Sequence, residues 1–96
     1  MQFLLLAHDG TDAEAPVRRQ QARGDHLAAM SKLKASGHFL YGGALLDDAG
    51  NMIGSAIVFD FPDRAALDET IARDPYTLGK VWQRVEIKNF RAAQVE

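Results

Sequence analysis

The chain of 96 residues contains no cysteine, and this absence excludes a disulfide framework and thiolate chemistry. It also has no glycine-rich loop of the phosphate-binding kind and no nucleophile elbow around a serine. We therefore expect no cofactor. A chain without cysteine fits a reducing compartment.

The sequence also lacks an excess of basic residues and a long hydrophobic run. Its 11 basic and 13 acidic residues are interspersed and leave a net charge of −2. Phosphate binding needs a concentrated basic surface, so nucleic acid is not expected as a partner. The apolar run from Phe3 to Ala7 is too short for a signal peptide or a membrane span. We expect a cytoplasmic protein with no membrane partner.

Length and composition indicate one compact domain over residues 1–96. The chain is 47% hydrophobic and 25% charged, close to average globular usage. A domain of this size buries about two thirds of its unfolded surface, which gives a real but thin core. Association with a second copy would add to that core.

Apolar patterning predicts four strands. The first is a nearly continuous apolar run, typical of a central strand, and the last alternates apolar and charged residues. Turn residues between the second and third strands, at 47–51, predict a hairpin loop. The expected strands cover residues 2–8, 39–46, 53–61 and 81–90.

Two segments have helical spacing. The first helix is expected to begin between Asp12 and Pro16 and to end near Ser36, with Gly24 as a local weak point. The second is expected to begin after Asp63, a suitable N-cap, and to end near residue 73, since the residue before a proline avoids the helical region. One stripe of the first helix contains Arg23, His26, Leu27, Met30, Leu33 and Lys34.

The element order β-α-β-β-α-β predicts an α+β, ferredoxin-like fold. In this fold a four-stranded antiparallel sheet carries both helices on one face. The other face would expose apolar side chains such as Leu4, Leu6 and Val58. An exposed apolar patch of this kind usually marks an interface, so we expect a homodimer packed through sheet faces.

The same topology brings distant residues to one end of the sheet. His8 ends the first strand, His26 lies early in the first helix, and Asp74 follows the second helix. A histidine and a carboxylate brought together in this way can form a proton-transfer dyad. His26 and Asp74 are therefore the candidate catalytic pair.

Several short motifs follow one another along nearly the whole chain. They are Arg23-Gly24-Asp25-His26-Leu27, Gly42-Gly43-Ala44-Leu45-Leu46, Ile53-Gly54-Ser55, Asp74-Pro75-Tyr76, Val85-Glu86-Ile87 and Phe90. Together they resemble the YCII-related (YciI-like) family of small ferredoxin-like proteins, which form dimeric α+β barrels. The resemblance implies a dimer whose active site uses a histidine and an aspartate, here His26 and Asp74.

Each catalytic candidate also has a structural interpretation. His26 lies in line with Met30 and would serve equally well as a hydrogen-bonded core histidine. Asp74 could be a turn residue that bonds its own backbone. Capping is not expected, because a carboxylate is unfavourable at the C-terminal end of a helix.

Five further residues are candidates for substrate binding, each with a structural alternative. Arg23 could pair with a substrate carboxylate or with Asp74, or lie solvated on the helix. Tyr76 could offer its phenol or simply pack, and His8 could contact a ligand or lie at a surface edge. Gly42 and Gly43 could admit a ligand close to the backbone or form a bulge. A metal site of His8, His26 and Asp74 is a remote alternative without a ligand-spacing signature, so no metal is expected.

The function expected from this site is proton abstraction, followed by elimination or isomerisation, on a small anionic or phenolic ring compound. The family resemblance implies that the enzyme would be a dehydrochlorinase-like lyase or an isomerase. A non-catalytic ligand-binding or regulatory module would use the same pocket without turnover. A protein whose sheet-mediated dimer is itself the function is a third alternative.

Overall fold

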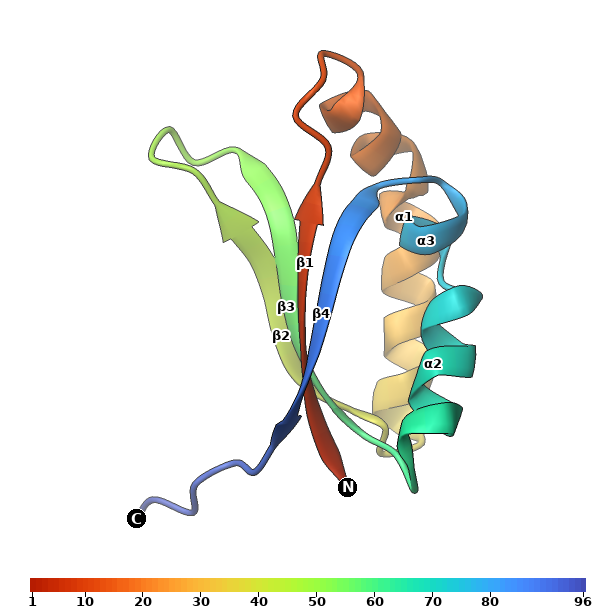
Figure 1. Cartoon of the computed structure of the whole chain (residues 1–96), viewed down its shortest axis with the longest axis vertical. Coiled ribbons are helices and arrows are strands. Elements are labelled where there is room, and N and C mark those ends of the chain that lie inside the picture. The colour runs from red at the N-terminus through yellow and green to blue at the C-terminus, as the bar shows by residue number, and fades with distance from the viewer.

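The computed structural model describes all 96 residues and contains four strands and three helices (Figure 1). Every predicted strand and both predicted helices are present, within one or two residues of their expected bounds. A short third helix, α3, was not predicted. The elements are β1 (Gln2–Asp9), α1 (Ala15–Ala35), β2 (Phe39–Leu46), β3 (Met52–Asp60), α2 (Arg64–Ala72), α3 (Pro75–Leu78) and β4 (Trp82–Phe90).

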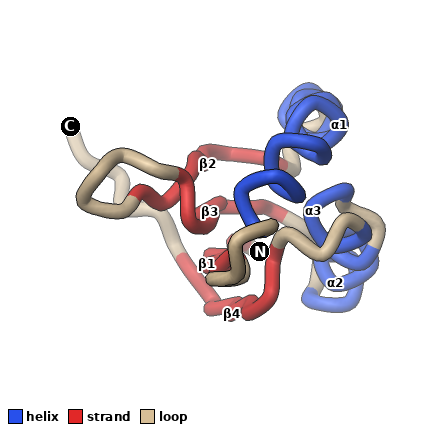
Figure 2. The backbone as a smooth tube through the Cα atoms, turned by 90° about the horizontal axis from the view of Figure 1, so that it is seen from above, coloured by secondary structure: helices blue, strands red, loops and turns tan.

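The four strands form one sheet in the order β2-β3-β1-β4, and all neighbouring strands are antiparallel. Seen from above, the helices lie together on one face of this sheet (Figure 2). This is the predicted ferredoxin-like arrangement. The two central strands, β1 and β3, contain most of the buried strand residues.

The core lies between the sheet and the helices. Phe3 and Leu5 of β1 point into it beside Ile57 and Phe59 of β3, and all four side chains are buried. Because side chains alternate along a strand, Leu4 and Leu6 turn to the opposite face, where they are half-buried. The sheet therefore has one face packed against the helices and one face without a covering layer.

The helix ends follow local chemistry. Asp63 caps α2, since its side chain accepts a hydrogen bond of 2.9 Å from the Ala66 backbone N–H. Gly37, at φ 84°, follows the end of α1 in a left-handed conformation that suits glycine. Gly24 does not interrupt α1, which is continuous through it. No helix of the protein combines the length and the hydropathy needed to cross a membrane.

Candidate functional site

His26 and Asp74 are in direct contact, as the sequence predicts. The distance between His26 Nδ1 and Asp74 Oδ2 is 2.8 Å, and both residues are buried, with 5% and 4% of their surface exposed. They lie 48 residues apart in the sequence, so the folding of the chain brings them together. Their catalytic role remains a prediction, but the geometry on which it depends is present.

Asp74 is held in place by the helix that follows it. Its backbone is extended, and its side chain caps the N-terminus of α3 by accepting a 2.9 Å hydrogen bond from the Tyr76 N–H. The expectation that Asp74 would not cap a helix was therefore wrong. A new helix begins at Pro75, so the carboxylate lies at a helix N-terminus, where negative charge is favoured.

The His26 ring is fixed by two aromatic neighbours. Tyr76 stacks on it with ring centroids 3.8 Å apart and planes within 10°, and Trp82 meets it edge-on at 5.6 Å. The other ring nitrogen, Nε2, has no hydrogen-bond partner and keeps some exposed surface. With Nδ1–H donating to an ionised Asp74, Nε2 carries the free lone pair that a general base requires.

A cavity of about 160 Å³ adjoins the His26 ring, between α1 and the strands β2 and β3. Four of the five residues predicted to bind substrate line it, namely Arg23, Tyr76, Gly42 and Gly43. The Arg23 guanidinium makes no ion pair with any residue, including Asp74. It is a half-buried, unpaired cation beside the cavity.

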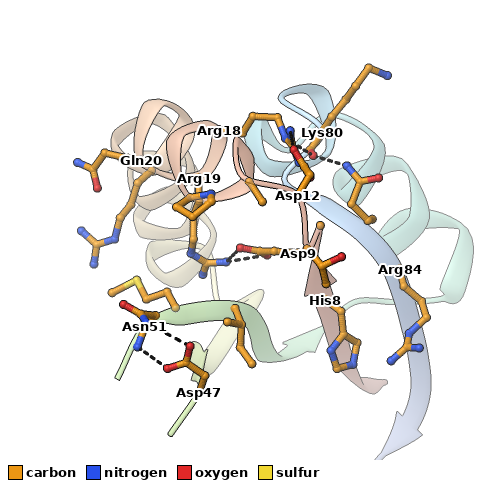
Figure 3. A pocket seen from close by; sticks show the side chains of 18 residues that line it. His8, Asp9, Asp12, Arg18, Arg19, Gln20, Asp47, Asn51, Lys80 and Arg84 are labelled. Carbon is orange, nitrogen blue, oxygen red and sulfur yellow. Dashed lines mark hydrogen bonds and ion pairs between the residues drawn. The ribbon is translucent and has the colours of Figure 1, made fainter. Parts of the chain in front are cut away.

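His8 does not line this cavity, so the structure does not bring it beside His26, and a ligand contact by His8 stays a prediction. It pairs in the sheet with Gly54 and Arg84, on the face that points away from the helices. There it borders a wider depression of about 1300 Å³ at the end of the sheet (Figure 3). His8, His26 and Asp74 consequently form no metal-binding cluster.

Gly42 is tightly packed, whereas Gly43 is not. A Cβ added at Gly42 would lie 3.0 Å from the Ala56 carbonyl oxygen and 3.0 Å from Ile57 Cγ1. A Cβ added at Gly43 would have no atom within 4 Å. The ladder irregularities of β2 flank the two glycines and do not fall on them, so the predicted bulge is displaced from them.

The glycine difference gives a matched pair of variants. We expect Gly42→Ala to lower the free energy of unfolding by about 1–3 kcal/mol, because the added methyl overpacks the β2–β3 contact. Gly43→Ala should leave it unchanged. Urea denaturation of both variants measures the difference, and equal midpoints would contradict the packing argument.

A buried polar network beside the cavity was missed by the sequence analysis. Arg19 Nη1 lies 2.9 Å from both carboxylate oxygens of Asp9, and Figure 3 shows the two side chains meeting. Arg19 Nη2 and Trp82 Nε1 each donate to Ser55 Oγ at 3.1 Å. Arg19 precedes Arg23 by four residues, on the stripe that includes His26, and this spacing was the one available signal.

Tyr76 joins this network to the dyad. Its ring stacks on His26, and the Arg19 guanidinium carbon lies 4.8 Å from the Tyr76 ring centroid. Burial raises the pKa of the Tyr76 phenol above its ordinary value of 10.0, and the charges of Arg19 and Arg23 oppose that rise only in part. The phenol is therefore neutral wherever the protein is folded near neutral pH.

The raised Tyr76 pKa predicts a loss of stability in alkali. The folded protein binds the phenolic proton more tightly than the unfolded chain does. Below the unfolded pKa of about 10 this preference does not affect stability, and the free energy of unfolding declines as the pH rises from that value toward the folded pKa. In a Tyr41→Phe variant Tyr76 is the only tyrosine, because the chain has two. Its phenolate absorbance should appear at higher pH in the folded protein than in urea; coincident titrations would contradict the prediction.

Comparisons with known proteins show which solved structures share this fold. The structure is similar to 5-chloro-2-hydroxyhydroquinone dehydrochlorinase from Burkholderia phenoliruptrix, solved with 2,5-dihydroxybenzoquinone, at 23% identity and a TM-score of 0.82, covering 97% of this chain and 96% of that one. It is similar to muconolactone isomerase at 18% identity and a TM-score of 0.67, covering 100% and 94%. A cofactor-independent oxygenase from Streptomyces nogalater matches at 17% identity and a TM-score of 0.55, covering 98% and 93%.

These likenesses establish the fold, which is one that hosts several small-molecule enzymes. No curated protein matches the sequence. The model of the YCII-related domain family, in contrast, matches residues 1–91. The chain therefore belongs to the YCII-related family.

Proposed function

We propose that the protein catalyses proton abstraction from a small ring compound, with His26 as the general base and Asp74 as its orienting partner. The proposal rests on one observation: the two nitrogens of the His26 ring have different surroundings. Nδ1 is held by a buried carboxylate, while Nε2 has no protein partner and the ring adjoins a cavity. A base must present its lone pair to the substrate in this way.

The reaction has two steps. Nε2 takes a proton from the substrate, and the bonding electrons move onto a ring oxygen as the imidazolium forms beside Asp74. In elimination the electrons then expel a leaving group with its bonding pair. In isomerisation the imidazolium returns the proton to a different atom of the ring.

The size and charge of the cavity support a single-ring substrate. A cavity of about 150 Å³ holds one benzene molecule, and this one has about 160 Å³. The unpaired Arg23 cation favours a substrate that carries or develops negative charge. The similar dehydrochlorinase and muconolactone isomerase are named for a chlorinated hydroxyhydroquinone and for muconolactone.

A panel of substrates tests the proposal. Chlorinated hydroquinones, hydroxyquinones and unsaturated lactones would be mixed with the purified protein and followed by absorbance and by chloride release. We expect saturable turnover of at least one class. Saturable binding without turnover would overturn catalysis in favour of a ligand-binding or regulatory module, and the absence of binding would favour a protein whose dimer is its function.

We also propose that the chain forms a homodimer through the uncovered face of the sheet. On that face Tyr41, Val58 and Leu4 stand in one row across three strands, and Tyr41 is 80% exposed. A row of apolar side chains across a sheet is a suitable interface core.

Light scattering at micromolar concentration should give the mass of a dimer. Val58→Lys, which places a charge in the centre of the row, should give a folded monomer. Replacing Lys88, at the charged β4 end of the same row, by Ala should leave the dimer intact. A monomeric wild-type protein would contradict the proposal.

A further inference from the structure

Ser55 has an incomplete set of hydrogen bonds. Its Oγ accepts one hydrogen bond from Arg19 Nη2 and a second from Trp82 Nε1, both of 3.1 Å. A hydroxyl oxygen has two lone pairs and one hydrogen. Both lone pairs are therefore occupied, and the hydrogen has no acceptor in the protein.

Ser55 lies at the wall of the cavity that adjoins His26. Ser55 is 2% exposed and lines this cavity from β3, opposite the α1 residues that line it. Trp82, which donates to Ser55, also packs edge-on against the His26 ring. A buried donor without an acceptor is costly unless a ligand or water supplies one.

The Arg19–Asp9 ion pair holds Arg19 in place as a donor to Ser55 Oγ. Both side chains are buried, with 7% and 5% of their surface exposed, so Arg19 cannot swing away to solvent. Its positive charge lies one hydrogen bond from Ser55 Oγ, and that charge makes the hydroxyl a stronger donor. The arrangement is set before any ligand arrives.

We infer that Ser55 donates its hydrogen bond to a negatively charged ring oxygen of the substrate, such as a phenolate or an enolate. The inference rests on the proposed function and names its substrate class. His26 removes the proton at one side of the cavity, and Ser55 stabilises the oxyanion that results at the other. Preorganised donors aimed at developing charge are a major source of catalysis.

Two ligands that differ only in a ring oxyanion test the inference without turnover. 4-Nitrophenolate carries a ring oxyanion, and nitrobenzene lacks that oxygen. We expect Ser55→Ala to weaken the binding of 4-nitrophenolate about 10- to 100-fold, which is the loss for a hydrogen bond to a charged group. The affinity for nitrobenzene should not change. Ser55→Thr, which keeps the hydroxyl, should retain the preference for the phenolate. Isothermal titration of the wild-type protein and the two variants with each ligand measures all six affinities.

If Ser55 has a purely structural role, Ser55→Ala should weaken the binding of both ligands equally. This outcome would overturn the inference. Ser55→Cys, with a weaker donor of similar size, should show an intermediate loss and replaces Ser55→Ala if that variant does not fold. His26→Asn should keep the preference for 4-nitrophenolate. This ligand has already lost its phenolic proton, so its binding does not need a general base. An unchanged preference for 4-nitrophenolate in Ser55→Ala and Ser55→Cys would overturn the role of Ser55 but not the role of His26 as general base. A wild-type protein that binds neither ligand would overturn both roles.

Discussion

His26→Asn and Asp74→Asn should each lower kcat/KM by about 10²- to 10⁴-fold, the contribution of a positioned general base. Asparagine preserves approximate size but cannot exchange the proton. The double variant should be little worse than either single variant, because a base and its orienting group act as a unit. Steady-state kinetics on the best substrate of the panel, with thermal melting of the same samples, measures both effects.

Asp63 supplies the control for this experiment. Like Asp74 it caps a helix through its side chain, but it lies at the start of α2 and lines neither described cavity. Asp63→Asn should therefore leave kcat/KM unchanged. If the Asp74 and His26 variants instead lose about 1–3 kcal/mol of stability, the cost of a broken buried hydrogen bond, and retain ligand affinity and turnover, the pair is a structural one.

Arg19→Met should lower the free energy of unfolding by about 3–5 kcal/mol, since it leaves the buried Asp9 carboxylate without its partner. Arg18, the preceding residue of α1, offers a matched control. It makes two hydrogen bonds to Asp12, at 2.8 and 2.7 Å, but that pair is exposed to solvent. Arg18→Met should therefore cost far less, because water and ions screen an exposed pair.

Chemical denaturation of the two arginine variants measures this contrast. The double variant with Asp9→Leu should recover part of the stability lost in Arg19→Met, since the uncompensated charge is then removed. Equal losses for Arg18→Met and Arg19→Met would show that burial does not distinguish the two pairs.

The strands and the two long helices could be predicted because each has a periodic pattern or a clear stop signal. Helix α3 could not, since four residues are too few for a periodic signal. Missing α3 led directly to the wrong expectation for Asp74, which was judged against the helix before it instead of the helix after it.

The dyad was predictable because connectivity alone brings its two residues to one end of the sheet. The Asp9–Arg19–Ser55 network was not, because each member is a single polar residue within or beside an ordinary element. Only the register of β1 against β3 and the rotation of α1 bring them together. The separation of His8 from the cavity beside His26 was not predictable for a related reason: one residue of register decides which face of a strand a side chain occupies.

The double role of Asp74 makes one backbone amide a reporter of the site. The Tyr76 N–H donates to the same carboxylate oxygen, Oδ2, that receives His26 Nδ1. Whenever α3 opens, this amide is released to solvent and the histidine loses its orienting partner in the same event. The exchange rate of the Tyr76 amide with deuterium therefore measures how often the dyad is dismantled in the resting protein.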